Sequence, residues 1–318
     1  MKKLIYAAIC FAGLAFCPAF AQDTVRYRCA SVEEAKRLIG EEDNYTRNWS
    51  RFDIVSRLEN PNGKKEDLIK LSTEEITEWS DLEKQRVGLM MQSINDTIRK
   101  YNYKIPYPEE IILIKSPMKS EGGAGGYTRN NWIVLVDGFF EKINKEFQLH
   151  LLLHETFHIL TRNNPEFKKQ MYATIGFSTT EEELEYPKDL SDRRISNPDV
   201  SRYDSYATFT VDNKPQKCAM ILYANRPYTT GKFFEYINIG FVLLDEDLKP
   251  VRQSDTTVVY PLDKITDFQD KVGKNTGYII HPEEILADNF VFAFLNKQGL
   301  PTPELIEKIQ NIIKQSSK

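Results

Sequence analysis

Histidine and cysteine are scarce in this chain, and neither sign of charge dominates it. Among 318 residues there are four histidines, four cysteines and three tryptophans, and the formal net charge is −4. No cluster of basic residues is present, so the composition argues against a nucleic-acid partner. Hydrophobic residues make up 41% of the chain, which at this length is enough for one sizeable core or two lobes.

Long apolar runs are missing beyond the first 21 residues. Residues 1–21 place Lys2 and Lys3 before an apolar stretch that ends in Ala-Phe-Ala, which is the order of a cleavable secretory signal. We therefore expect cleavage after Ala21, export to the periplasm or the exterior, and no membrane span after cleavage. A membrane anchor fits less well, because the apolar stretch is short and Pro18 interrupts it near its end.

Only two cysteines, Cys29 and Cys218, lie beyond this signal. Export would place them in an oxidising compartment, so a disulfide between them is one expectation. Two unpaired, buried thiols are the alternative, since nothing in their spacing favours a bridge.

The rest of the sequence alternates between helical and β-rich patterns and predicts an α+β fold. Ser80 and Glu83 form a capping box ahead of a long helical run. The short β-rich runs 111–115 and 132–136 predict two strands joined by a glycine-rich connection. We expect five regions: a signal at 1–21, an N-terminal helical region at 22–103, a sheet and a helix at 104–176, an inserted loop and antiparallel β region at 177–262, and a C-terminal helical region at 263–318.

The stretch 149–162 holds three of the four histidines. His154 and His158 are four positions apart, so on a helix both imidazoles lie on one face and can reach a single zinc ion. Glu155 lies beside them and can act on a water molecule that the metal holds. The flanking residues are uncharged, which predicts a buried helix with these three side chains facing a cleft. His150 lies too far along the helix axis for the same ion, and we expect a core or rim histidine there.

These residues resemble the zincin metallopeptidases, whose signature is H-E-x-x-H. The metzincin branch would have glycine and histidine where this chain has Thr161 and Asn164, which excludes it. The gluzincin, or thermolysin-like, branch takes its third ligand from a glutamate in an E-x-x-x-D context on a later helix. The resemblance implies a zincin-like fold with a mixed sheet, an active-site helix and one Zn²⁺ ion.

Two later segments have the E-x-x-x-D letters. Glu185 and Asp189 are separated by Pro187, which would break the helix that the motif needs. Glu284 and Asp288 have no proline between them and lie in an apolar helical pattern. The resemblance therefore implies that Glu284 is the third metal ligand and that Asp288 hydrogen-bonds a ligating histidine.

Other residues near this motif have weaker assignments. Glu283 lies about 100° around the helix from Glu284, so we expect its removal to leave metal affinity nearly unchanged. His281 precedes Pro282 and is expected to cap the helix. The candidate donors to a transition-state oxyanion are Tyr127, Tyr223, Tyr228 and His281, with His281 and Tyr228 preferred.

The glycine-rich stretch and strand over 122–135 come just before the histidine-containing helix. In zincins the strand beside that helix commonly pairs with the substrate backbone, and glycine permits such close approach. A hairpin loop without a role is the alternative.

The resemblance and the motif together predict an exported zinc-dependent metallopeptidase that acts on peptides or proteins. His154, His158 and Glu284 would bind the zinc, and Glu155 would be the general base. A noncatalytic zinc-containing envelope binding protein is one alternative, although a structural site has four protein ligands and no use for Glu155. A zinc hydrolase of a nonpeptide amide is the other.

Overall fold

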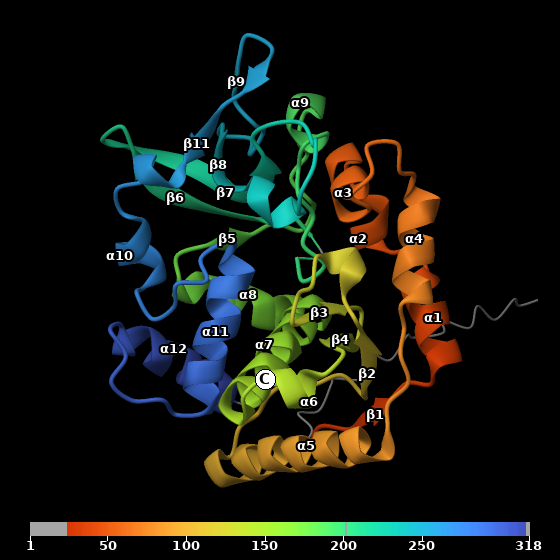
Figure 1. Ribbon diagram of the computed structural model, residues 1–318. Helices are drawn as coiled ribbons and strands as arrows, with labels where there is room; N and C mark the ends of the chain where they lie inside the picture. The colour runs from red at the N-terminus through yellow and green to blue at the C-terminus, as the bar shows by residue number, and fades with distance from the viewer. Residues whose placement is uncertain (1–23, 201, 316–318) are drawn as a thin grey trace, which may run out of the picture.

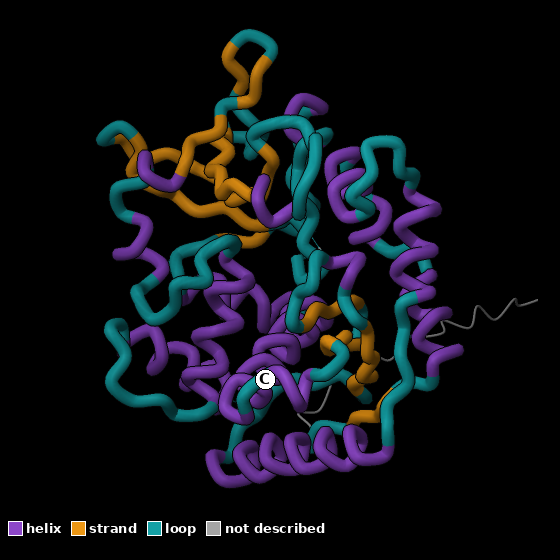
Figure 2. The backbone as a smooth tube through the Cα atoms, viewed as in Figure 1, coloured by secondary structure: helices purple, strands orange, loops and turns teal. Residues whose placement is uncertain are grey.

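The structure is a computed structural model that describes residues 24–200 and 202–315. The expected signal at 1–21 lies outside these residues. Helices surround one mixed sheet and adjoin a second, antiparallel sheet, so the α+β expectation is confirmed. Strands gather in two separate groups with long loops between them (Figure 2). Within the described residues, no helix is both long enough and apolar enough to cross a membrane.

The first sheet packs against α7 (Lys145–Asn163), the helix that carries the candidate metal ligands His154 and His158. Its strands, in spatial order, are β1 (Tyr27–Cys29), β2 (Ile111–Ser116), β4 (Trp132–Val136) and β3 (Gly126–Arg129). The first three strands are parallel, and β3 pairs antiparallel with β4, so β3 is an edge strand. Both long strands were expected from their β-rich runs. The very short β1 falls in a region where only helices were expected.

Five helices form the N-terminal region, and two of them, α1 and α5, pack against opposite faces of this sheet (Figure 1). They are α1 (Val32–Gly40), α2 (Asn44–Arg47), α3 (Arg51–Arg57), α4 (Lys65–Glu74) and α5 (Asp81–Tyr101). Ser80 caps α5 in a reciprocal capping box with Glu83, as the sequence predicts. Successive residues of β2 are buried on opposite faces of the sheet. Leu113 packs in the same hydrophobic cluster as α5, and Ile114 packs in the same hydrophobic cluster as α1.

The helices that follow the first sheet pack against it and against each other. They are α6 (Phe139–Lys142), α7 (Lys145–Asn163), α8 (Pro165–Thr174), α11 (Pro282–Phe294) and α12 (Pro303–Lys314). Helices α6 and α7 are separate, because Asn144 begins α7 by accepting a hydrogen bond from the Phe147 amide. Phe157 of α7 and Phe290 of α11 are in contact, with ring centroids 5.3 Å apart.

The second sheet is the antiparallel β region that the sequence predicts. Its order is β11 (Val259–Pro261), β8 (Ile237–Leu244), β7 (Lys214–Ala224), β6 (Ser205–Val211) and β5 (Ser178–Thr179). Shorter elements flank it: α9 (Lys188–Ser191), α10 (Phe268–Val272), the hairpin of β9 (Arg252–Gln253) and β10 (Thr256–Thr257), and two 3₁₀ turns, η2 (Phe233–Tyr236) and η3 (Leu262–Lys264). A third 3₁₀ turn, η1 (Lys119–Glu121), lies between β2 and β3 of the first sheet.

The two cysteines belong to different sheets. Cys29 ends β1 and Cys218 lies within β7, and both are free thiols. The expected disulfide is therefore wrong, and the alternative of two unpaired thiols describes the structure. Burial raises the pKa of Cys218 to about 12, so this thiol stays protonated and unreactive.

Candidate metal centre

Helix α7 holds three ionisable side chains inside the protein. His154, Glu155 and His158 are 6%, 3% and 0% exposed. Their neighbours on the helix are uncharged and buried, so α7 has packing partners on most of its circumference. As predicted from the spacing, the helical repeat places the two imidazoles one turn apart, with ring centroids 4.8 Å from each other.

Helix α11 brings a carboxylate to both imidazoles. Its first turn is fixed by Pro282 and by His281, whose Nδ1 accepts a hydrogen bond from the Glu283 amide. Glu284 Oε2 then lies 2.9 Å from His154 Nε2 and 3.5 Å from His158 Nε2. Ligand atoms of these three buried residues all lie within 4.8 Å of one another, so the group could hold a metal ion.

The other nitrogen of each imidazole contacts a further carboxylate, a different one for each ring. Asp288 Oδ1 lies 2.9 Å from His154 Nδ1, and Glu283 Oε1 lies 3.2 Å from His158 Nδ1. Such contacts fix the tautomer and the orientation of a metal-binding histidine. The contact between Glu283 and His158 gives a reason to expect that removal of Glu283 lowers metal affinity, in contrast to the expectation from its place on the helix. Glu283 does lie on a different face of α11 from Glu284, but His158 is one turn further along α7 and meets it there.

Two polar atoms at the centre are buried without a hydrogen-bond partner. They are Glu155 Oε2 and His158 Nε2. An unpaired buried polar group costs about 1–3 kcal/mol, so leaving two of them together calls for an explanation. A cation and the water it carries would satisfy both atoms. Two imidazoles and one carboxylate, with a further position open, also form a donor set that suits a catalytic divalent metal.

The charges of the centre depend on one another. Burial opposes a charge on Glu284, but His158 and His154 outweigh it and hold the pKa of this carboxyl well below its usual range. Burial also lowers the pKa of His154, yet hydrogen bonds to Asp288 and Glu284 raise it to about 10. A cation that binds here therefore has to displace protons from the imidazoles.

The pKa of the Glu155 carboxyl is shifted in the opposite direction from that of Glu284. Burial, supported by the negative charge of Asp199, raises the pKa of the Glu155 carboxyl to about 8. A carboxyl whose pKa lies near neutrality can both accept and return a proton. Gly126 of β3 packs directly against it, because a Cβ at this glycine would lie 2.8 Å from Glu155 Oε1. The edge strand and the candidate base are thus in close contact.

Residues that the sequence did not indicate complete the surroundings. Asn197 Nδ2 donates a 2.5 Å hydrogen bond to Glu284 Oε1. The Asp199 carboxylate lies within 4.8 Å of ligand atoms of Glu155 and His158. The ring of Tyr278 is 5.9 Å from that of His154. Asn197 and Asp199 come from an irregular segment without hydrophobic periodicity, so no sequence signal pointed to them.

The structure gives the two preferred oxyanion donors, Tyr228 and His281, other hydrogen-bond partners. The Tyr228 hydroxyl donates to the carbonyl of Gly231, and its ring packs on Phe52 and Tyr236. It lines a separate hollow of about 640 Å³ in which no member of the metal cluster takes part. His281 caps α11, and burial lowers its pKa to about 4, which keeps it neutral.

His150 lies at the rim of the centre, as expected. Its Nε2 is 3.0 Å from Asp288 Oδ1, and its ring stacks on Phe147. Ligand atoms of His150, His154 and Asp288 also lie within 4.8 Å of one another, but His154, His158 and Glu284 form the group in which all three residues are buried.

Comparisons with known proteins do not extend these observations: no protein-family model, curated protein or solved structure matches the chain.

Proposed function

We propose that this protein is a zinc-dependent peptidase of the gluzincin type. One observation carries the proposal: His154, His158 and Glu284 converge on one point, and the unpartnered oxygen of Glu155 is buried beside them. A purely structural zinc site needs a fourth protein ligand and has no use for a free carboxylate at this place. Two imidazoles and one carboxylate with an adjacent glutamate are the donor set of a hydrolytic zinc centre.

The residues of the chain have distinct roles in this proposal. His154, His158 and Glu284 hold the metal, and Asp288 and Glu283 fix the two imidazole rings. Zinc bound there would polarise the substrate carbonyl and make a water molecule more acidic. Glu155 takes the proton of the attacking water and passes it to the nitrogen of the leaving amine.

Tyr278 replaces Tyr228 as the donor to the oxyanion in this proposal. Its ring lies against His154 and lines the same cleft as Asp199. The negative charge of Glu284, together with burial, raises the pKa of the Tyr278 phenol. The hydroxyl therefore keeps its proton and can donate it in a hydrogen bond to the developing negative charge.

The test combines metal analysis with one substitution. Purified protein should contain about one zinc ion per chain and should cleave peptides in an unbiased peptide library. Glu155→Gln should keep the zinc and lower turnover by about 10² to 10⁴-fold, because it removes the proton acceptor. Glu146→Gln, in the exposed first turn of the same helix, is the matched control and should change neither.

Each alternative makes a different forecast for the same assay. A noncatalytic zinc protein would contain zinc, cleave nothing and show no effect of Glu155→Gln. A hydrolase of nonpeptide amides would leave the peptide library intact and act on acylated amines or cell-wall crosslinks. Export is part of the proposal and is checked by mass spectrometry of the mature chain, which should begin at Gln22.

A further inference from the structure

The edge strand beside the metal centre is closed at one end by another part of the chain. Residues 195–200, here called the strap, run from β7, where the Ile195 amide donates to the Leu222 carbonyl, to the outer edge of β3 at Asp199. The Thr128 amide and hydroxyl both donate to Asp199 Oδ1, over 2.7 and 2.8 Å. Arg162 of α7 donates to the carbonyls of Thr128, Pro198 and Asp199. A substrate strand therefore cannot continue past Thr128 along this edge.

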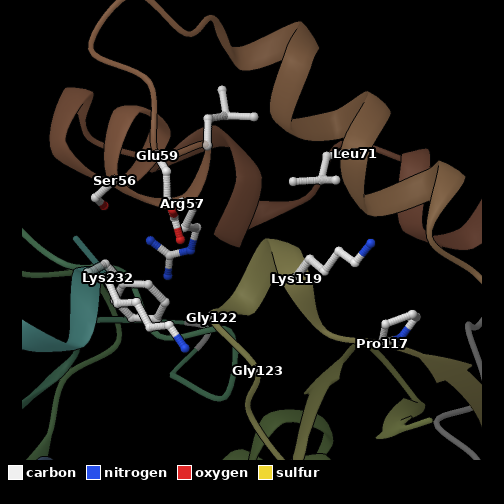
Figure 3. A pocket seen from close by; sticks show the side chains of 11 residues that line it. Ser56, Arg57, Glu59, Leu71, Pro117, Lys119, Gly122, Gly123 and Lys232 are labelled. Carbon is white, nitrogen blue, oxygen red and sulfur yellow. The ribbon is translucent and has the colours of Figure 1, made fainter. Parts of the chain in front are cut away.

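The strap is held from its other side by the N-terminal helices. Its Ser196 amide donates to Asp53 over 2.9 Å, and the Ser196 carbonyl accepts from Arg57 over 2.6 Å. Arg57 and Asp53 are buried and paired with each other on α3. Figure 3 shows Arg57 reaching from α3 toward Lys232, beside a cavity of about 400 Å³. Residues 195–199 of the strap line a second cleft, beside β3, and the contacts with α3 hold them in place there.

The opposite end of the same edge is open on the Cβ side of Gly123, where an added Cβ would meet no atom within 4 Å. One residue earlier, a Cβ at Gly122 would lie 2.5 Å from the Phe233 ring, so the chain before Gly123 is packed against this side chain. Glu155, which contacts Gly126, lies between this open end and the strap. A chain that adds to β3 can therefore extend toward the glycines but must end near Asp199.

The negative charge of Asp199 favours the N-terminus of a peptide over its C-terminus at the strap. Within residues 24–200 and 202–315, Asp199 forms no salt bridge with a lysine or arginine side chain, although the Arg162 guanidinium donates to its backbone carbonyl and offsets part of its negative charge. A peptide that pairs antiparallel with β3 brings its N-terminal ammonium to this carboxylate. A peptide that pairs in parallel would bring a carboxylate there, and the two like charges would repel each other.

Distance sets how far the substrate reaches past the scissile bond. The amino nitrogen and the carbonyl carbon of one residue are only about 2.5 Å apart, from standard bond lengths and angles. The Asp199 carboxylate lies within 4.8 Å of ligand atoms of Glu155 and His158. An ammonium bound by Asp199 thus belongs to the same residue whose carbonyl reacts beside Glu155.

We propose that the protein is an aminopeptidase that removes one N-terminal residue at a time, with Asp199 binding the substrate's ammonium group. This inference rests on the proposed peptidase function. The side chain of the released residue enters a cleft of about 90 Å³, whose apolar wall is formed by Leu222, Phe233, Phe234, Ile237, Tyr278 and Ile280. A peptide that begins with leucine is therefore the probe of choice.

The experiment compares two forms of one hexapeptide that begins with leucine, with a free or an acetylated N-terminus. Zinc-loaded full-length protein is incubated with each, and mass spectrometry identifies the products. The free peptide should lose leucine first, and the acetylated peptide should react at least about 100-fold more slowly, because it lacks the charged hydrogen-bond donor. This comparison uses the wild-type chain and does not depend on the folding of any variant.

Substitutions then assign the ammonium site. Asp199→Asn should raise KM for leucine p-nitroanilide by about 10- to 100-fold, the value of a hydrogen bond to a charged group, with a smaller change in kcat. Asp199→Glu should recover part of the loss, because it restores the charge. Asp267→Asn is the matched control: Asp267 also accepts from a threonine amide and hydroxyl, those of Thr210, but takes no part in the metal cluster.

The outcomes separate this inference from the proposed function. Cleavage of the acetylated peptide at internal bonds, at the rate of the free peptide, would leave a peptidase and overturn the aminopeptidase. Release of residues from the C-terminus, or a wild-type KM in folded Asp199→Asn, would overturn it as well. If the zinc-loaded protein cleaves neither peptide nor the anilide, the peptidase proposal fails and this inference fails with it.

Discussion

Removal of Glu283 is the sharpest test of how the metal centre is held. Its Oε1 faces His158 Nδ1 at 3.2 Å and also accepts from the Thr161 hydroxyl, and its Oε2 accepts from Tyr172 over 2.5 Å. Hydrogen bonds from His158 and Thr161 overcome burial and keep the pKa of this carboxyl low. Glu283→Ala removes the acceptor for all three donors at once.

The size of the effect follows from those contacts. Loss of a carboxylate that orients a ligating histidine lowers metal affinity by about 10- to 100-fold, which corresponds to about 1.4–2.8 kcal/mol. The buried Tyr172 hydroxyl and His158 Nδ1 also lose their partner, at about 1–3 kcal/mol each, so the free energy of unfolding should fall by about 2–6 kcal/mol. Glu283→Gln keeps the shape and one acceptor and should show smaller losses of both kinds.

Zinc affinity is measured by competition with a chelator, and folding by thermal denaturation of the metal-free proteins. Asp288→Ala is the comparison, because Asp288 holds His154 as Glu283 holds His158. If Glu283→Ala binds zinc as tightly as wild type while Asp288→Ala loses at least about tenfold, the contact to His158 does not orient a ligand. The reasoning about paired carboxylates would then be refuted.

Three further predictions concern protons, space and thiols. The pKa of His154 is about 10, and the pKa of His158 is raised well above the ordinary value, so both side chains hold protons at pH 7.5. Zinc binding should therefore release about two protons, which calorimetry in buffers of different ionisation enthalpy can count. Release of no protons would contradict this prediction. Gly126→Ala should lower kcat and leave zinc content unchanged, because its methyl group would press on the general base; an unchanged kcat would show that the strand gives way. Labelling of unreduced, unfolded protein should find two free thiols, Cys29 and Cys218, whereas no label would indicate a bridge.

The metal-free protein should also respond to alkaline pH. The folded pKa of His154 is raised from 6.5 to about 10. Its stabilising contribution is therefore fully present below pH 6.5 and is lost as the pH rises toward 10. The melting temperature of metal-free protein should decrease over this interval, and the decrease should be smaller in Asp288→Asn, which lacks one of the charges that stabilise the imidazolium.

Local periodicity explains which parts of the centre the sequence predicts. The helical repeat alone places His154 and His158 on one face, and the same repeat pairs Glu284 with Asp288. Capping chemistry marks the start of α5 at Ser80 in the same way. These features depend on residues within a few positions of one another, so the sequence carries them directly.

Features that depend on how distant segments meet could not be predicted. Glu283 contacts His158 only because α11 crosses α7 where it does, and the position of Glu283 on its own helix gives no hint of this. Asp199 lies in a segment without a repeat, and its place is set by Thr128 and Arg162. Tyr278 lies in a loop beside His154, and no sequence pattern distinguishes it from the other tyrosines of the chain.

The anchoring of the strap to α3 has a consequence for how this protein can evolve. Arg57 and Asp53 set the position of Ser196, and through it the reach of Asp199, without contacting any metal ligand. Substitutions in α3 can therefore shift Asp199 without altering His154, His158 or Glu284. Under the proposed aminopeptidase function, such changes would alter the length of the segment that is removed, through a helix that carries none of the candidate ligands.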